Sequence, residues 1–324
     1  ERLELKPSDP MAAGVRRVEA DGLRVLGLIA WQQVDHAGAR DYFEQALSIY
    51  REIGNRRYEA GTLNNLALVS LELGDTTEAR GYYKPALRIF RQIGERRGEL
   101  LVLGNLGVMF DQHGDYDQAR RYYEQSLTAR REIDDRSGEC QALANLGLLF
   151  HNLGDDEAAW EHSQQAVRIA QSIGDRRWQA FALTNLGHTL VGLERPGEAI
   201  EVLQKAASIR QELGEHSLAM ETLACLTRAY LAQGDSDSAL ACAEEILDYL
   251  KENTLDGADE PFKVYLTCYR ALRANEDSRA QDVLAEAHRL LQERAAKIGD
   301  EELRRSFLEN VTAHREVIEA WESR

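Results

Sequence analysis

The sequence is poor in residues that cross-link or interrupt a fold. Its 324 residues include only four cysteines and five prolines. No two cysteines form a Cys-x-x-Cys pair, which argues against zinc fingers and dithiol redox motifs. Four thiols in a chain of this length fit a reducing cytoplasm, where cysteine serves as a small buried apolar residue. We therefore expect a cytoplasmic protein without disulfides.

Long apolar runs and an excess of positive charge are also missing. No stretch of 18 uncharged apolar residues occurs, so we expect no membrane span. The chain has 39 Lys and Arg against 55 Asp and Glu, a formal net charge of −16. Such an acidic chain lacks the basic field that phosphate binding needs, which argues against nucleic acid as a direct partner. No signal peptide opens the sequence, and its start at Glu1 suggests a fragment or a trimmed form of a longer protein.

What the sequence does contain is an internal repeat of 40 residues. The residue after each repeated leucine is Gly, Ala or Thr, as a close contact between helices requires, and an alanine series from Ala39 to Ala239 keeps the same step. The repeated leucines are Leu26, Leu66, Leu106, Leu146, Leu186, Leu226 and Leu266. The length alone would suggest two or three domains, but a repeat indicates one array that grows by adding units.

Two turns divide each unit into two helices. Four of the first turns read Gly-Asp, beginning at Gly74, Gly114, Gly154 and Gly234. Glycine accepts the left-handed conformation at the end of a helix, and aspartate caps the start of the next one. No stretch alternates with the period of two that a strand requires. The sequence therefore predicts an all-α protein.

The order of these small and aromatic residues resembles the tetratricopeptide repeat, in the 40-residue variety seen in kinesin light chains and in sensors of bacterial signalling proteins. The resemblance implies a right-handed α-solenoid of seven helix pairs over residues 14–299. It weakens in the fifth unit, where Glu194-Arg195-Pro196 replaces Gly-Asp, and in the seventh, where Arg270 replaces an aromatic residue. Residues 1–13 would be a linker or the remnant of a preceding region.

The tail after Gly299 leaves the repeat pattern. Leu303, Phe307 and Val311 form an apolar stripe, so we expect residues 300–324 to form a capping helix over the last unit. The segment 298–311 also resembles the C-terminal end of bacterial signal-transduction ATPases with numerous domains and of related regulators. That resemblance implies an inducer sensor, with a switch domain further upstream in the full-length chain.

No catalytic motif accompanies the repeat. The sequence has no GxxxxGK[ST] loop, no HExxH, no GxSxG and no EF-hand loop, and its eight histidines are scattered. We therefore expect neither an enzyme nor a bound cofactor or metal.

An asparagine series precedes the repeated leucine in four consecutive units. Asparagine is about 0.5 kcal/mol worse than alanine inside a helix, so its repetition needs a reason. The resemblance implies that these amides line the concave groove and bind the backbone of an extended peptide; the alternative is a hydrogen bond between helices that fixes repeat stacking, and one residue can do both. The series is Asn65, Asn105, Asn145 and Asn185, with Asn64 doubling the first.

Six further residues one helical turn away should share this face: Glu72, Gln112, Gln141, Asn152, His188 and Arg228. Arg228 suggests a ligand with a negative end at the C-terminal side of the groove. The chain lacks the Lys and Arg pairs of the chaperone carboxylate clamp, so the tails of heat-shock chaperones are not expected ligands.

Three functions fit this pattern. The first is a bacterial peptide- or protein-binding sensor whose ligand lies in the concave groove. The second is a constitutive scaffold that assembles a complex without an inducer. The third is a solenoid that closes around a small metabolite.

Overall fold

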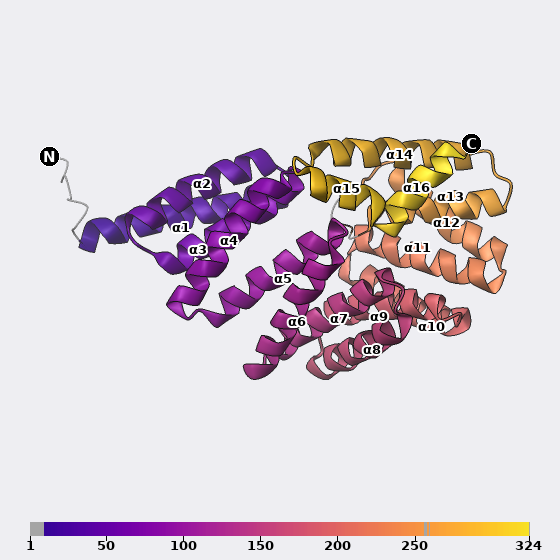
Figure 1. Ribbon diagram of the computed structural model, residues 1–324, viewed down its shortest axis with the longest axis horizontal. Coiled ribbons are helices and arrows are strands. Elements are labelled where there is room, and N and C mark those ends of the chain that lie inside the picture. Colours follow the sequence, from indigo (N-terminus) through magenta and orange to yellow (C-terminus); the bar gives the residue numbers. More distant parts are fainter. Residues whose placement is uncertain (1–9, 256–257, 259, 324) are drawn as a thin grey trace. The chain divides into compact units, whose positions relative to one another are not determined.

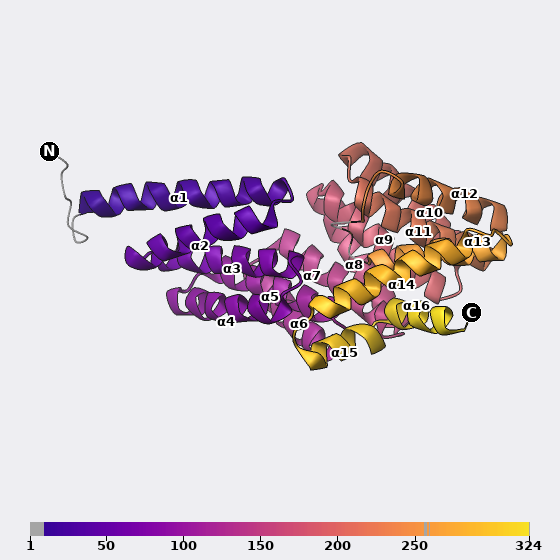
Figure 2. The same cartoon turned by 90° about the horizontal axis from the view of Figure 1, so that it is seen from above.

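The computed structural model describes residues 10–255, 258 and 260–323, and every regular element in this part of the chain is a helix (Figures 1 and 2). The first fourteen helices follow one another as seven pairs, which confirms the predicted all-α repeat fold. They are α1 (Pro10–Gln32), α2 (His36–Glu52), α3 (Arg56–Glu72), α4 (Thr76–Ile93), α5 (Arg96–Gln112), α6 (Tyr116–Glu132), α7 (Arg136–Asn152), α8 (Asp156–Ile173), α9 (Arg176–Gly192), α10 (Pro196–Leu213), α11 (His216–Gln233), α12 (Ser236–Leu250), α13 (Pro261–Ala274) and α14 (Ala280–Lys297). None of the described helices combines the length and the apolar character that crossing a bilayer requires.

The turn inside each pair is built as the sequence predicts. Gly74 has a φ of 82°, and the side chain of Asp75 accepts a hydrogen bond of 2.8 Å from the backbone N–H of Glu78 at the start of α4. The first, fifth and seventh pairs differ, because Val34, Glu194 and Glu276 take the left-handed position, with φ values of 62°, 57° and 54°. A β-branched residue at positive φ is strained, so the turn at Val34 has a conformational cost.

Small residues follow the repeated leucines because the second helix of each pair lies against them. A Cβ atom on Gly187 would come within 2.4 Å of the Leu203 side chain, and one on Gly27 within 2.7 Å of Phe43. The leucine itself is buried, as at Leu66, which is 0% exposed. The repeat therefore records the contact between the helices of one pair.

The first pair has one open face. Leu26 and Ile29 of α1 are 45% and 43% exposed, whereas Leu66 and Val69, 40 residues later, are both fully buried. In the later helix pairs, the preceding pair covers the position of the repeated leucine. No described helix precedes α1, so its apolar stripe faces solvent.

The chain divides into two compact units. Unit 1 comprises Glu1–Met109 with Lys297–Glu301, and unit 2 comprises Phe110–Ala296 with Glu302–Arg324. Within unit 1, Lys297 lies against Gly74 in the turn between α3 and α4, and Nη1 of Arg80 on α4 is 3.3 Å from Asp300 Oδ2. Unit 1 is therefore completed by residues that come almost 200 positions after its main body.

The tail holds two helices where the sequence predicts one. These are α15 (Glu301–Glu309) and α16 (Thr312–Glu322), separated because Val311 adopts an extended conformation at the start of α16. In α16, the ring of His314 lies 4.8 Å from that of Phe262 on α13, and Trp321 stacks on His288 of α14 at 4.6 Å. The tail thus covers the last pair within unit 2. Of the predicted leading segment, residues 1–9 lie outside the described residues, and 10–13 belong to α1.

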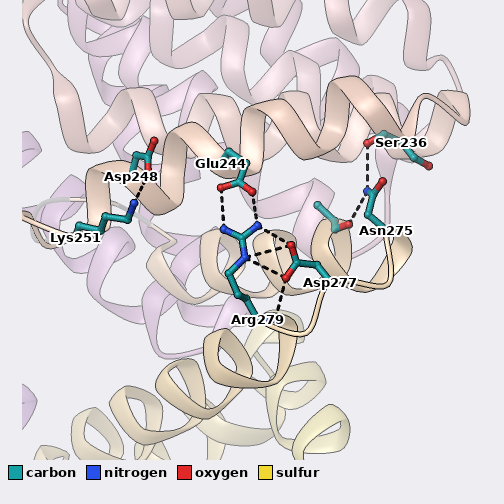
Figure 3. A network of polar contacts seen from close by, with 8 residues as sticks. Ser236, Glu244, Asp248, Lys251, Asn275, Asp277 and Arg279 are labelled. Atoms are coloured by element: carbon teal, nitrogen blue, oxygen red, sulfur yellow. Dashed lines mark hydrogen bonds and ion pairs between the residues drawn. The ribbon is translucent and has the colours of Figure 1, made fainter.

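Polar contacts join the helices of unit 2 where the repeat pattern is weakest (Figure 3). Arg279, just before α14, donates to Glu244 on α12 and to Asp277 in the preceding turn. Hydrogen bonds from the side chain and backbone N–H of Arg279 lower the pKa of Asp277 to about 2. Asn275 at the end of α13 donates to the Ser236 carbonyl at 3.3 Å. These surface contacts each stabilise little, but they fix the register of α12, α13 and α14.

Candidate functional site

The asparagine series lies at the contact between consecutive first helices. Within unit 1, Asn105 Nδ2 donates to Asn64 Oδ1 at 2.9 Å; within unit 2, Asn185 Nδ2 donates to the Ala144 carbonyl, also at 2.9 Å. Both bonds connect positions 41 residues apart. Each of these two amides therefore holds one helix pair in register with the pair before it, which is the stacking role that the sequence allows.

Burial separates the members of the series. Asn64 and Asn185 are each 3% exposed and Asn145 is 8% exposed, whereas Asn65 and Asn105 are half-buried. The half-buried amides have the accessible surface that ligand contact needs. Their contact with a ligand remains a prediction.

The other predicted groove residues fall into two groups. Glu72 is exposed near the end of α3, Gln112 is half-buried at the end of α5, and Gln141 accepts a hydrogen bond of 3.3 Å from Arg130. In unit 2, Asn185, His188 and Arg228 line one cavity, and Asn152 lies beside it, where it accepts a hydrogen bond of 3.4 Å from Lys263. The structure therefore gathers three of the predicted site residues in the lining of one cavity.

That cavity lies on the face formed by the first helices of unit 2. Its volume is about 400 Å³ with its open mouth included. Four of the helices that contribute to it are first helices of their pairs, namely α7, α9, α11 and α13, and α10 adds one residue (Figure 1). The lining residues are Leu148, Phe181, Thr184, Asn185, His188, Arg210, Glu221, Ala224, Cys225, Arg228, Glu260, Lys263 and Val264. Apolar walls with a few polar groups are typical of ligand pockets.

Arg228 is the cation of this pocket that has no carboxylate partner among the described residues. Its Nη1 donates to Nδ1 of His188 at 3.0 Å, and this half-buried guanidinium forms no ion pair there. Burial, followed by the charges of Lys263 and Arg228, lowers the pKa of His188 well below its usual value. A neutral imidazole can accept the hydrogen bond from Arg228, so His188 orients the guanidinium without neutralising it.

A second histidine supports this arrangement from α7. The ring of His151 lies 5.6 Å from that of His188, and its Nδ1 is 2.6 Å from Asp156 Oδ1. Burial lowers the pKa of His151, although the hydrogen bond to Asp156 opposes this effect. The imidazole pair therefore adds polar surface without adding charge at neutral pH.

Lys263 and Glu260 form an ion pair at the other side of the pocket. Lys263 Nζ lies 2.7 Å from Glu260 Oε2 and donates to Asn152 Oδ1 at 3.4 Å. Burial would raise the pKa of Glu260, but the charge and hydrogen bond of Lys263 outweigh it and keep that pKa low. The backbone N–H of Glu260 donates to Glu221, which ties the start of α13 to α11. Both carboxylates of the lining thus already have partners.

Arg210 is a buried arginine in the pocket wall. It is 2% exposed, and its Nη1 lies 2.7 Å from Glu215 Oε2. Its Nε has no hydrogen-bond partner in the described part of the protein. An unsatisfied buried donor is costly, so a polar ligand atom or a water at this wall would be stabilised.

Arg210, Glu221, Glu260 and Lys263 are pocket residues that the sequence pattern does not reveal. Arg210 stands 120 residues after Phe90, at a core position of the repeat, where an apolar side chain is expected. Lys263 and Glu260 stand 40 residues after Leu223 and Met220, in two further registers that are otherwise apolar. A charged residue in such a register was the signal that could have been found, although Arg130 shares the register of Arg210 and pairs with Asp135 without lining the pocket.

Metal and thiol chemistry receive little support from the geometry. Within the described residues, no three His, Cys, Asp or Glu side chains are placed to hold a metal ion. Cys225 lines the pocket, but burial raises the pKa of its thiol to about 12, so it is protonated at neutral pH.

Comparisons with known proteins agree with the repeat. Sequence profiles described as tetratricopeptide repeat match residues 12–52, 58–132 and 138–212, which together exceed half of the chain. No curated protein sequence gives a significant match.

Several solved structures share the fold at low sequence identity. A Rap protein in complex with competence and sporulation factor is 16% identical with a TM-score of 0.60, over 93% of this chain and 75% of that one. The apo quorum sensor NprR from B. thuringiensis is 20% identical with a TM-score of 0.63, over 84% and 75%, and NprR with its cognate peptide NprX gives 0.61 at 16% identity, over 83% and 75%. A signal-transduction ATPase with a tetratricopeptide repeat sensor from Pyrococcus horikoshii is 19% identical with a TM-score of 0.58. The match covers 88% of this chain but only 44% of that protein.

Proposed function

We propose that this chain, which belongs to the tetratricopeptide repeat family, is a peptide-binding module whose ligand occupies the first-helix face of unit 2. One observation carries the proposal: the predicted groove residues Asn185, His188 and Arg228 line one open pocket, and Arg228 there has no carboxylate partner among the described residues. Glu260 attracts this guanidinium only at longer range, and a bound ligand would supply a carboxylate in direct contact with it.

The similar structures support this function by analogy of fold. NprR has been solved with its cognate peptide and the Rap protein with competence and sporulation factor, and both share this repeat architecture. At identities of 16% they establish the fold alone, so the ligand of this chain has to be determined directly.

We further propose that the module senses an inducer for a larger regulator. The signal-transduction ATPase from Pyrococcus horikoshii carries a tetratricopeptide sensor as one part of a longer protein. The present chain spans less than half of that protein. In such an arrangement the peptide would bias a switch outside the repeats, because it binds one conformation of the solenoid more tightly than another.

A selection from a displayed library of random peptides tests the binding function. Peptides enriched on the wild-type protein are synthesised, and their affinities are measured by fluorescence anisotropy against two variants. Ala224→Leu adds bulk to the pocket wall, whereas Ala241→Leu adds the same bulk to an exposed position of the second helix α12. We expect binding at least tenfold weaker for Ala224→Leu and unchanged for Ala241→Leu.

Circular dichroism melts establish whether each variant is folded before its affinity is compared. The proposal is wrong if no peptide is enriched on the wild-type protein. It is also wrong if the enriched peptides bind a folded Ala224→Leu variant as tightly as the wild type.

A further inference from the structure

We infer that the unit 2 pocket selects peptides through a carboxylate, which Arg228 binds. This inference rests on the proposed peptide binding and specifies the chemical group that the peptide must present. The carboxylate is either the C-terminus of the peptide or an Asp or Glu side chain, since both offer the same pair of oxygens.

The orientation of Arg228 favours a planar anion. Its Nη1 is held by His188 at 3.0 Å, and its Nε and Nη2 have no partner among the described residues. Guanidinium presents its donors in a rigid fork that matches the two oxygens of a carboxylate, and such bidentate pairs are among the strongest hydrogen bonds in proteins. Because His188 occupies one donor only, the remaining edge of the fork is available to a ligand.

The carboxylates of the pocket are bonded to other groups, although the charges of Glu260 and Arg228 attract each other at longer range. Glu260 is paired with Lys263, and Glu221 accepts from the backbone N–H of Glu260. Lys263 lies on the same side as Glu260 and supplies additional positive potential, which also acts on His188. A carboxylate that enters the pocket therefore meets the two donors of Arg228 that have no partner among the described residues, beside the ion pair of Lys263 and Glu260.

The rest of the lining favours an organic anion over a free inorganic one. Leu148, Phe181, Ala224 and Val264 provide apolar walls beside the polar groups, and the mouth of the pocket is open, so a peptide can place one group inside while its chain continues outside. The buried Nε of Arg210, which lacks a partner, and the hydroxyl of Thr184 add polar groups to the wall. This combination fits a carboxylate attached to a residue with an apolar side chain or backbone beside it.

Three pools of synthetic random heptapeptides test the inference by affinity selection with mass spectrometry. The first pool has free C-termini and contains no Asp or Glu, the second has amidated C-termini and contains both, and the third is amidated without either. The protein variants are the wild type, Arg228→Gln, Arg228→Lys and, as a control, Arg168→Gln, which changes an exposed arginine of the second helix α8.

We expect the wild type and Arg168→Gln to retain peptides from the first or the second pool at least tenfold better than from the third. The pool that is retained identifies the source of the carboxylate. Arg228→Gln should lose this preference, and Arg228→Lys, which keeps the charge but not the fork, should retain part of it.

Two outcomes would overturn the inference. If the wild type retains the third pool as well as the others, the chain binds peptides but does not read a carboxylate. If a folded Arg228→Gln variant keeps the preference for carboxylate-containing pools, a residue other than Arg228 binds the carboxylate. Retention of none of the three pools by the wild type would instead refute peptide binding itself, and the inference with it.

Discussion

The C-terminal helices should lose stability as the pH falls from 7 to 5.5, because His314 is buried as a neutral imidazole. Its Nδ1–H donates to the Phe307 carbonyl at 2.7 Å, and the Phe262 ring lies 4.8 Å away. Burial lowers the pKa of His314 from 6.5 to about 4, helped by the charges of Arg294 and His113 and opposed by the hydrogen bond to Phe307 and the charge of Glu260. Protonation would place a charge on a side chain that is shielded from water.

The sign and size of the effect follow from the two pKa values. Between pH 6.5 and pH 4 the unfolded chain binds a proton at this residue and the folded chain does not, so acidification favours unfolding. From pH 7 to pH 5.5 the expected loss is about 1.2 kcal/mol, or about eightfold in the opening equilibrium. The comparison stops at pH 5.5 because the sequence pI of about 5.0 would bring the chain close to zero net charge.

Hydrogen exchange followed by mass spectrometry of peptides from residues 301–323 measures this opening directly. His314→Gln keeps a donor for the Phe307 carbonyl but cannot become charged. The amide protection of residues 301–323 in this variant should therefore lack the part of the pH dependence that His314 causes. Comparing the two proteins at the same pH cancels the intrinsic exchange rate. His216→Gln, at an exposed histidine on α11, is the control and should behave as the wild type. An equal ratio of protection factors for wild type and His314→Gln at both pH values would refute the reasoning.

Three further substitutions test the backbone and packing arguments. Val34→Asn should stabilise the protein by about 1 kcal/mol in urea unfolding, because asparagine tolerates the φ of 62° better than valine, and an unchanged midpoint would contradict this. Gly54→Ala should destabilise by about 1 kcal/mol for the same reason, since its φ is 70° and a Cβ there would meet no atom within 4 Å. Asn185→Ala should cost about 1 kcal/mol through the lost hydrogen bond to Ala144, and a melting temperature equal to that of the wild type would show that the bond does not contribute.

The fold was predictable because repeated contacts leave a repeated sequence. Leucine at a fixed step and a small residue after it record the packing within each pair, and Gly-Asp records the turn. The tail was less predictable, because the break at Val311 depends on local backbone conformation and leaves no periodic signal.

The candidate site was predicted only in part. Spacing places Asn185, His188 and Arg228 on one face, but it does not reveal whether an amide points to a ligand or to the neighbouring helix. Side-chain rotation decides this, as the bond from Asn185 to Ala144 shows. Lys263 keeps the 40-residue step from Leu183 and Leu223, but that register predicts a buried apolar side chain, so only the structure shows its ammonium group in the pocket.

The return of the tail to early residues has a consequence for the order in which the protein can finish folding. Arg80 and Asp300 are 220 positions apart, whereas most contacts of the repeats join neighbouring helices. At typical synthesis rates the ribosome needs on the order of ten to forty seconds to add that length. The turn between α3 and α4 therefore emerges and folds long before the residues that cover it exist. The turn between α3 and α4 is therefore exposed to solvent in the nascent chain until residues 297–301 are made. Loss of the last 28 residues would leave the same turn uncovered in the finished protein.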